Sequence, residues 1–291
     1  MEQGRIIKGI GGFYYVQLDG GLVVECRARG RFRRDGKPPL VGDLVTILPQ
    51  REGAALVDEI LPRKNELVRP MAANVDRLLL VLSASAPPPD WLLADKLLIQ
   101  AHCAGIAPLL LLNKCDAANR DTLDAFLKDY ASFDTLCVSA KTGQGIRQLG
   151  ELLQEGVSCF AGQSAVGKTS LLNALIPGLS LETGGLSRKT ERGRHTTRHA
   201  QLVPFGAGAV LDTPGFSLYD TQDLEQDVLD ACYPEFGALP AQCRFPGCMH
   251  VSEPDCAVKR MVEAGGMSPA RYARYVLLAK EFEQRRKHRY D

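Results

Sequence analysis

Residues 162–169 have the composition and spacing of a phosphate-binding loop. Their letters, GQSAVGKT, fit the pattern G-x-x-x-x-G-K-[ST], follow the apolar run 157–161 and precede the helix-like run SLLNAL. In such a loop backbone N–H groups surround a phosphate, and the N-terminus of the following helix adds its positive end. Lys168 would reach the β- and γ-phosphates, and the Thr169 hydroxyl would ligate Mg²⁺. We therefore expect a nucleoside triphosphate site formed by Gly162, Gln163, Ser164, Ala165, Val166, Gly167, Lys168, Thr169 and Ser170.

Two earlier segments indicate which base is bound. Asn113-Lys-Cys-Asp116 fits N-K-x-D and follows an expected strand at 108–112, while Ser139-Ala-Lys141 follows the next one. The carboxylate of Asp116 would accept hydrogen bonds from guanine N1–H and its exocyclic amine, a donor pair that adenine lacks, and losing such a partner costs about 10⁴-fold or more in discrimination. In the same element Asn113 would brace the loop, Lys114 would lie along the base and ribose, and a backbone N–H of Ser139, Ala140 or Lys141 would meet guanine O6. Alone, N-K-x-D could be a strand-to-turn connection. Together with the second segment and the phosphate loop, it favours GTP and makes a P-loop ATPase the least favoured alternative.

The remaining nucleotide elements lie after the phosphate loop. Asp212-Thr-Pro-Gly215 fits D-x-x-G, in which Asp212 reaches Mg²⁺ through water and the Gly215 N–H meets the γ-phosphate. Residues 193–198 (GRHTTR) are typical of a first switch, with Thr197 (or Thr196) as a further Mg²⁺ ligand. Most GTPases carry the phosphate loop first and N-K-x-D last, so the order here predicts a circularly permuted GTPase.

The residue after D-x-x-G is unusual for a GTPase. Many GTPases have a glutamine there that orients the attacking water, but this chain has Phe216. Phenylalanine cannot position water, so His195 in the expected switch is our candidate for this catalytic role. The alternative for His195 is a phosphate-contacting or solvent-facing side chain. We expect slow intrinsic hydrolysis that a partner can activate.

A cluster of cysteines predicts a metal site near the C-terminus. Cys243, Cys248, His250 and Cys256 offer three thiolates and one imidazole within 14 residues. This is a complete tetrahedral ligand set for structural Zn²⁺, with no open position for chemistry. The alternative, free cysteines in a core, suits a Pro- and Gly-rich stretch poorly. We expect zinc binding to fold the segment.

The first 66 residues indicate a small β-barrel of the OB type. Four short β-rich runs, at 4–11, 13–18, 22–27 and 43–48, are separated by Gly, Asp and Pro, and no helical period is visible. A basic segment follows the third run. We expect it to bind RNA through arginines set around an exposed Phe32; the alternative is a charged hairpin. Its arginines are Arg27, Arg29, Arg31, Arg33 and Arg34.

The rest of the chain divides into an α/β part and a mainly helical part. Expected strands at 75–83, 108–112, 136–139 and 157–161 alternate with expected helices at 91–104, 122–130 and 146–153, which predicts a mostly parallel sheet. A helix is expected at about 269–289. We therefore expect an OB-fold domain at 1–66, the permuted GTPase domain at 67–220 and a zinc-binding C-terminal domain at 221–291.

The composition of the chain excludes several classes of protein. With 291 residues, 45% hydrophobic and 24% charged, the chain is neither disordered nor fibrous. Its apolar runs are too short to span a bilayer, so no membrane partner is expected. The start lacks a signal-peptide pattern, and nine cysteines fit a reduced, cytoplasmic protein.

The net charge is distributed unevenly along the chain. It is +2 for residues 1–66, −6 for 67–256 and +5 for 257–291, so we expect a polyanionic partner to contact the two ends of the chain. Nothing in the sequence requires a dimer, and we expect a monomer.

The motifs taken together resemble the bacterial RsgA (YjeQ/YloQ) family of small-ribosomal-subunit-dependent GTPases. The resemblance covers essentially the whole chain and includes RPMAANVD at 69–76, the phosphate loop, H-T-T, D-T-P-G-F and C-x4-C-x-H-x5-C. Ala165 departs from the family, which often has Gly there, the family varies at the position of Lys141, and the C-terminal extension is short.

The resemblance implies a late-acting assembly factor that binds the immature 30S subunit and its rRNA through the barrel and the zinc domain. Its GTPase would be stimulated by the subunit, with hydrolysis accompanying release, and His195 would act in hydrolysis. Two alternatives remain: a permuted GTPase that acts on a protein or metal partner, and a binding module that changes shape with GTP or GDP without useful turnover.

Overall fold

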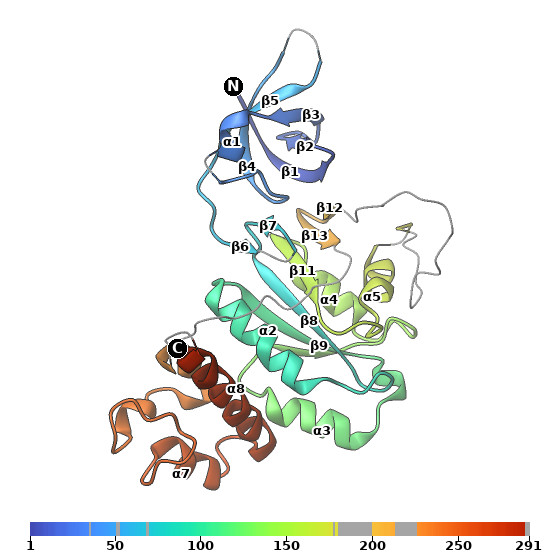
Figure 1. The fold of residues 1–291 in the computed structure, drawn as a ribbon. Helices are drawn as coiled ribbons and strands as arrows, with labels where there is room; N and C mark the ends of the chain where they lie inside the picture. The colour runs from blue at the N-terminus through green and yellow to red at the C-terminus, as the bar shows by residue number, and fades with distance from the viewer. Residues whose placement is uncertain are drawn as a thin grey trace, which may run out of the picture.

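The computed structural model describes residues 1–34, 36–50, 53–67, 70–176, 178–179, 200–212 and 226–288. The N-terminal barrel lies at one end of the molecule, the central sheet lies in the middle, and the last helices lie at the other end (Figure 1). The expected fold class is confirmed: a barrel, a permuted α/β domain and a mainly helical C-terminal region that carries the cysteine cluster.

The barrel is a closed sheet of five strands in the order β1-β2-β3-β5-β4, with β4 pairing back to β1. Gly4 allows β1 and β2 to approach closely, because a Cβ there would lie 2.5 Å from the backbone oxygen of Gln17 on β2. Inward residues such as Ile6, Val16 and Val57 are fully buried. The strands are β1 (Glu2–Ile10), β2 (Phe13–Leu18), β3 (Val23–Ala28), β4 (Leu44–Leu48) and β5 (Ala55–Ile60).

The basic segment of the barrel differs from its expected form in two ways. Residues Gly30–Arg34 form a short helix, α1, where no helical period was visible. The expectation of an exposed aromatic is wrong, since Phe32 is only 8% exposed and belongs to the core cluster that the barrel shares with the central sheet. Phe32 therefore anchors α1 and is not available to stack on a base.

The central sheet is parallel over five strands in the order β10-β9-β8-β11-β13, as its alternating pattern predicts. Strand β13 forms a hairpin with β12, which runs antiparallel to it at the edge of this sheet. The strands are β8 (Arg77–Ser83), β9 (Ala107–Asn113), β10 (Thr135–Cys137), β11 (Val157–Ala161), β12 (Gln201–Phe205) and β13 (Gly208–Asp212).

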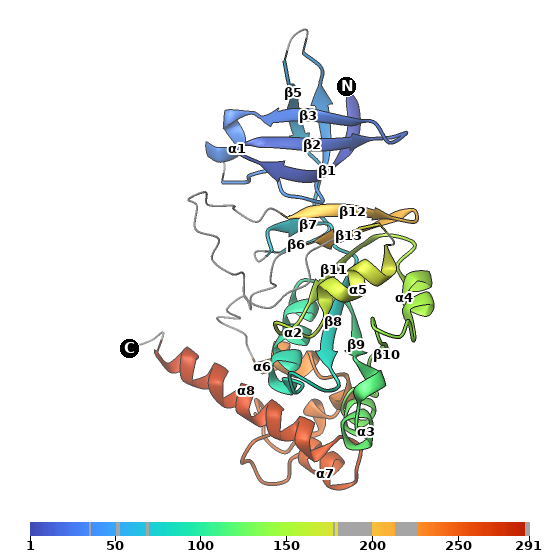
Figure 2. The same ribbon diagram turned by 90° about the vertical axis from the view of Figure 1, so that its right-hand side faces the viewer.

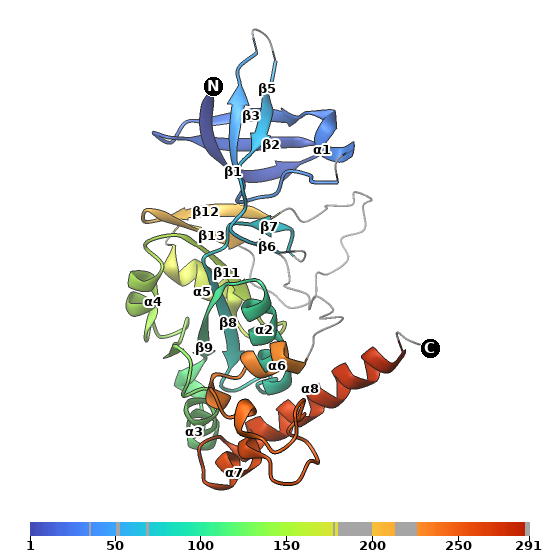
Figure 3. The ribbon, with the colours of Figure 1, turned by 90° about the vertical axis from the view of Figure 1, so that its left-hand side faces the viewer.

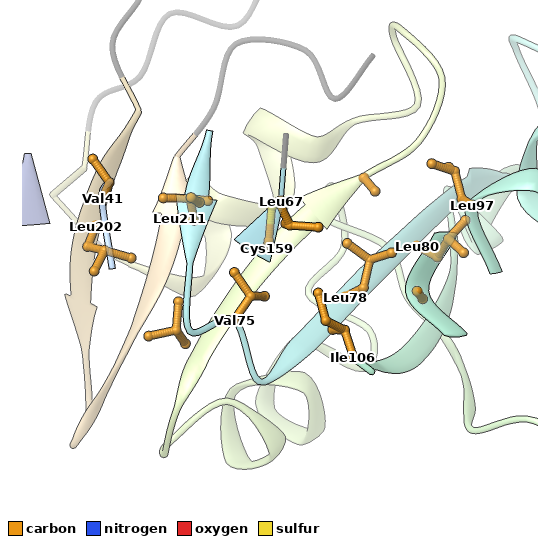
Figure 4. Packing of buried hydrophobic residues seen from close by; sticks show 14 of the residues in the cluster. Val41, Leu67, Val75, Leu78, Leu80, Leu97, Ile106, Cys159, Leu202 and Leu211 are labelled. Atoms are coloured by element: carbon orange, nitrogen blue, oxygen red, sulfur yellow. The ribbon is translucent and has the colours of Figure 1, made fainter. Parts of the chain in front are cut away.

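Helices cover both faces of this sheet, which explains the continuous apolar run of β8. Leu78 and Leu80 face the cluster that contains Leu97 of α2 (Figure 4), whereas Leu79 and Val81 belong to a second cluster with residues of α4 and α5. Burial on both faces is typical of parallel sheets. The helices are α2 (Trp91–Cys103), α3 (Arg120–Asp129), α4 (Ile146–Leu152) and α5 (Lys168–Leu175), with a 3₁₀ turn, η1, at Cys115–Ala117.

The barrel and the central sheet are joined by backbone hydrogen bonding. Strand β12 lies beneath β1 (Figure 2) and pairs with it at Lys8 and Gln201, so the two sheets form one sheet of eleven strands. A small hairpin, β6 (Glu66–Leu67) with β7 (Ala72–Ala73), lies in the connection. A cavity of about 380 Å³ lies at this junction, lined by β1 and by the β12–β13 hairpin.

The C-terminal region packs against α2 and α3 through buried ion pairs. Arg271 donates to Asp95 at 2.7 Å and to Glu235 at 2.6 Å, and Arg274 contacts Asp95 at 2.5 Å and Asp129 at 2.9 Å. Arg271 and Asp95 are each 1% exposed. We call these five side chains the arginine network. The region comprises α6 (Gln226–Ala231), η2 (Pro234–Phe236), η3 (Pro240–Gln242), α7 (Ala257–Glu263) and α8 (Pro269–His288).

Replacing Arg271 with methionine is expected to destabilise this interface strongly. Glu235 would lose the arginine with which it pairs, and Asp95 would lose one of its two arginine partners. Breaking a buried ion pair lowers the free energy of unfolding by about 3–5 kcal/mol. The ring centroid of Trp91, the single tryptophan, lies 6.1 Å from that of Tyr130, and the Arg271 guanidinium lies over the Tyr130 ring. Urea unfolding followed by tryptophan fluorescence therefore reports on this interface. Arg147→Met, at an exposed pair with Glu151, is the control and should change the free energy of unfolding by about 0.5 kcal/mol or less. Equal effects of both changes would contradict a structural role for the network.

Among the described residues, no helix has both the length and the apolar character needed to cross a membrane.

Candidate functional site

The phosphate loop connects β11 to the N-terminus of α5, at the carboxyl edge of the parallel strands, where ligands of α/β sheets bind. Its two glycines are required by close contacts. A Cβ on Gly162 would lie 2.2 Å from the Val81 backbone oxygen, and one on Gly167 would lie 2.3 Å from Asn113 Nδ2. Both also have positive φ angles, 132° and 99°. The loop therefore packs its backbone directly on β8 and on the N-K-x-D element.

Ala165 is a third position of positive φ in this loop, at 62°. A side chain in the left-handed region costs about 1 kcal/mol or more, so a glycine would fit this position with less strain. The Ala165 backbone oxygen accepts a hydrogen bond from Lys114 Nζ at 2.9 Å. The N-K-x-D lysine therefore holds the strained residue in place.

The Lys168 amine lies across the phosphate loop. Its Nζ donates to the backbone oxygens of Gly162 at 2.8 Å and Gln163 at 2.7 Å. Burial lowers the pKa of this amine below its ordinary value. Among the described residues no carboxylate pairs with this amine, so the amine is suited to an anionic ligand such as a phosphate.

Asn113 joins the phosphate loop to the second guanine element. It is 1% exposed; its Nδ2 donates to the Val166 oxygen at 2.8 Å, and its Oδ1 accepts from the Ala140 N–H at 3.2 Å. One side chain therefore connects three loops that are far apart in the sequence. Lys114, beside it, has a φ of 64°, which turns the chain at the end of β9.

Ser139 orients the carboxylate expected to read the base. Its hydroxyl donates to Asp116 Oδ1 at 2.6 Å and accepts from the Thr142 N–H at 3.2 Å. Lys141 Nζ lies 4.0 Å from Asp116 Oδ2. Asp116 is thus held by one side chain while its second oxygen faces an exposed lysine. Sequence reasoning gave Ser139 only a backbone role; its hydroxyl contact with Asp116 had no sequence signal.

The other nucleotide residues are only partly described. Thr169 and Ser170 open α5, and Asp212 ends β13, whose pairing with β11 brings it to the same sheet edge as the phosphate loop. Thr196, Thr197, His195, Gly215 and Phe216 lie outside the described residues.

The arginines of the barrel are partly occupied by contacts within the protein. Arg29 lies 2.9 Å and Arg31 3.7 Å from the Asp58 carboxylate, and Arg27 lies over the Phe13 ring with its guanidinium carbon 4.6 Å from the centroid. Arg33 and Arg34 belong to α1. The barrel still places a cation over an aromatic ring, but the pair is Arg27 and Phe13, and the expected Phe32 is not part of it.

The cysteine cluster brings four potential ligand atoms close enough together to hold a metal ion. Cys243 Sγ lies 3.5 Å from His250 Nδ1 and 3.8 Å from Cys256 Sγ, and His250 Nδ1 lies 3.3 Å from Cys256 Sγ. Cys248 Sγ is the fourth ligand atom, and the four atoms lie within 4.8 Å of one another. Tetrahedral Zn²⁺ with ordinary bond lengths separates its ligand atoms by about 3.5–3.8 Å, so these residues fit the ion.

Further contacts orient the imidazole of this cluster. His250 Nε2 lies 3.2 Å from Asp230 Oδ2, and Tyr272 donates its hydroxyl to the His250 backbone oxygen at 2.6 Å. A carboxylate on the second imidazole nitrogen fixes the tautomer that leaves Nδ1 free for a metal. Asp230 and Tyr272 stand far from the cysteines in sequence, so no local pattern could have identified them.

Removing the metal is expected to unfold the C-terminal region. We expect about one equivalent of zinc in the purified protein, and chelation should abolish the cooperative unfolding of this region because ligand binding and folding are coupled. Cys248→Ser should reproduce the effect, whereas Cys26→Ser, at a barrel cysteine, should retain zinc. A protein that contains no zinc and keeps its circular dichroism with chelator would contradict the prediction.

Comparisons with known proteins identify the family. Residues 60–222 match the RsgA GTPase model and residues 3–57 match the RsgA N-terminal domain model. The chain is 42% identical over 291 residues to a protein of Caldanaerobacter subterraneus subsp. tengcongensis named small ribosomal subunit biogenesis GTPase RsgA, covering 99% of this chain and 98% of that protein. A protein of the same name from Shouchella clausii is 43% identical over 292 residues, with 99% of both chains covered.

Solved structures give the same result. The crystal structure of YjeQ from Thermotoga maritima is similar with a TM-score of 0.82 and 35% identity, covering 97% of this chain and 98% of that one. The structure of YloQ, described as a circularly permuted GTPase, gives a TM-score of 0.80 and 37% identity, covering 98% and 96%. The permuted order of the motifs agrees with the description of the second structure, and the chain belongs to the RsgA family of circularly permuted GTPases.

Proposed function

We propose that this GTPase acts late in the assembly of the small (30S) ribosomal subunit, binding its rRNA and leaving it when GTP is hydrolysed. The observation that carries the proposal is full-length similarity to proteins named small ribosomal subunit biogenesis GTPases, combined with three nucleotide loops joined by Asn113. The site therefore supplies the GTP chemistry, and the relatives suggest where it is used.

In the proposed site, Asp116 reads the guanine and Lys168 holds the β- and γ-phosphates. The partly buried amine and the Ser139-oriented carboxylate support these roles. Mg²⁺, when bound with GTP or GDP, would neutralise phosphate charge; Thr169, Thr197 and Asp212 are the residues that would hold it. Gly215 would meet the γ-phosphate.

The proposed catalytic residue is His195. Phe216 leaves the position of the usual glutamine without a group that can orient water, and His195 lies in the expected switch.

The proposed protein is a cytoplasmic monomer with three domains, at residues 1–66, 67–220 and 221–291. Arg27, Arg29, Arg31, Arg33 and Arg34 on the barrel, with the basic C-terminal residues, are the proposed rRNA contacts. Zn²⁺ is the proposed occupant of the cysteine cluster.

GTP hydrolysis measured with isolated ribosomal subunits tests the proposal. We expect slow turnover by the protein alone, marked stimulation by small subunits, none by large subunits and no turnover of ATP. His195→Ala should still bind small subunits and lose the stimulated turnover. Stimulation that is absent, or equal with both subunits, would overturn the ribosomal role and leave the GTPase chemistry standing.

A further inference from the structure

Two aromatic rings lie on the outer face of the barrel. Successive side chains of a strand point to opposite faces, and Val16 of β2 is fully buried in the barrel, so Phe13 and Tyr15 point outward. Both residues are partly exposed. Figures 2 and 3, which view the molecule from opposite sides, show the barrel at the far end from α7 and α8. The described part of the C-terminal region therefore does not cover this face.

Each ring is paired with a cation from a neighbouring strand. Lys8 of β1 lies opposite Tyr15 in the sheet, with its Nζ 5.9 Å from the centroid of the ring. Arg27 of β3 lies opposite Phe13, with its guanidinium carbon 4.6 Å from that centroid. The Tyr15 hydroxyl donates to Glu25 Oε2 at 3.1 Å, which orients the ring. We call these five residues the aromatic face.

The two cation–ring pairs have the chemistry of a site for unpaired nucleotides. Bases stack on aromatic rings and on guanidinium planes, and cations beside them contact phosphates. Residues i and i+2 of a strand are about 6.6–6.8 Å apart, whereas consecutive bases of one strand in a B-form duplex are about 3.4 Å apart. Two neighbouring bases can therefore reach both Phe13 and Tyr15 only when they are unstacked from each other. A single strand permits this arrangement, and a duplex does not.

The charges around the aromatic face favour a polyanion over a peptide. Residues 1–66 carry a net charge of +2. Glu25 is the one anion of the face, and it lies on the opposite side of β2 from Lys8, so the β1 side of Tyr15 is open to a phosphate. Strand β3 continues from Arg27 directly into the basic segment, which carries Arg29, Arg31, Arg33 and Arg34.

We propose that the aromatic face binds two consecutive unpaired nucleotides of RNA. One base stacks on the layer formed by Phe13 and Arg27, the other stacks on Tyr15, and Lys8 contacts a phosphate. The site rests on the proposed RNA binding by the barrel and names the class of RNA that the barrel takes. Phe13 and Tyr15 thus have the stacking role for which Phe32 was expected.

Binding of single-stranded RNA to the full-length, zinc-loaded protein tests the proposal. The probe is a labelled oligouridylate of about ten nucleotides, within the site size of such a barrel, and fluorescence anisotropy measures its affinity. We expect Phe13→Leu and Tyr15→Leu each to weaken binding at least about fivefold, the loss expected for one stacked base. Neither change should alter the dependence of affinity on salt. Lys8→Gln should instead make the slope of log affinity against log salt shallower by about 0.7, the contribution of one phosphate contact.

Conservative variants separate loss of stacking from loss of folding. Tyr15→Phe keeps the ring and removes only the hydroxyl that donates to Glu25, and Phe13→Tyr keeps the ring at the other position. Both should retain oligouridylate binding. A blunt RNA duplex with at least as many phosphates should bind equally to the wild type and to the two leucine variants, since its bases cannot reach the rings. Equal losses in Tyr15→Phe and Tyr15→Leu would contradict stacking at this position.

The outcomes also distinguish this site from the ribosomal role. Unchanged oligouridylate affinity in both leucine variants, or an equal loss of duplex affinity, would overturn the proposal. Leucine variants that keep oligouridylate affinity but no longer bind small subunits would also overturn it, because the face would then contact a protein. Leucine variants that lose oligouridylate affinity would support the site even if small subunits failed to stimulate GTP turnover, and only the ribosomal role would then be wrong.

Discussion

Replacing Lys168 with alanine is expected to lower GTP turnover about 100- to 1,000-fold, since losing one preorganised group that stabilises transition-state charge has an effect of this size. The amine now donates to the oxygens of Gly162 and Gln163 at the site where phosphates would bind. Its loss removes this partly buried positive charge and leaves the core clusters, to which Lys168 does not belong, unchanged. Turnover with and without small subunits is the measurement.

Binding to small subunits distinguishes the interpretations of that result. Retained binding with lost turnover would support an enzyme whose chemistry controls release. Lys128→Ala, an exposed lysine in the last turn of α3, is the matched control and should have normal turnover. Unchanged turnover in the Lys168 variant would contradict the assignment of the phosphate loop. Full function of a non-hydrolysing variant in subunit assembly would favour a binding module.

Replacing Asp116 with asparagine is expected to weaken GTP binding about 100- to 10,000-fold. The carboxylate would accept two hydrogen bonds from guanine, and each bond to a charged group contributes about 1.5–3 kcal/mol. Asparagine instead presents an amide N–H next to the guanine amine, so two donors would meet. Xanthine has a carbonyl at that position, and the variant should therefore gain affinity for xanthosine triphosphate.

Equilibrium binding of labelled GTP and xanthosine triphosphate measures both effects. Ser139→Ala is the companion variant, because it removes the hydroxyl that donates to Asp116 at 2.6 Å while leaving the carboxylate. We expect it to weaken GTP binding by a smaller factor and to give no gain for xanthosine triphosphate. Equal affinity of the wild type for GTP and ATP would refute guanine selection by this loop.

Much of the fold and the position of the nucleotide loops could be predicted from the sequence. A continuous apolar run with short connections specifies a parallel strand, so the segments at 157–161 and 75–83 became β11 and β8 with nearly the expected bounds. Each motif directly follows such a strand. Since parallel strands bring their carboxyl ends to one edge, the phosphate loop and N-K-x-D had to meet there, and Asn113 joins them.

Other features depend on contacts that no local pattern carries. Phe32 was expected to face solvent because arginines surround it, yet it packs into the core, since a helical turn places it on the opposite side from its neighbours. Strand β12 was not expected, because Pro204 interrupts its run and its partners are β13 and β1. The arginine network pairs Arg271 with Asp95 across 176 positions of sequence.

The permuted strand order has a consequence for the timing of synthesis. Strands β8, β9 and β10 are adjacent in the sheet and consecutive in the chain, so they can pair as soon as they leave the ribosome, and β11 then adds beside β8. The barrel can close earlier still, since a domain generally folds as a unit. The base-recognition loops are therefore made before the phosphate loop, and the pairing of Lys8 with Gln201 can form only after both have been made. The expected Mg²⁺ and γ-phosphate element at 212–215 is made later still, when nearly three quarters of the chain has been synthesised.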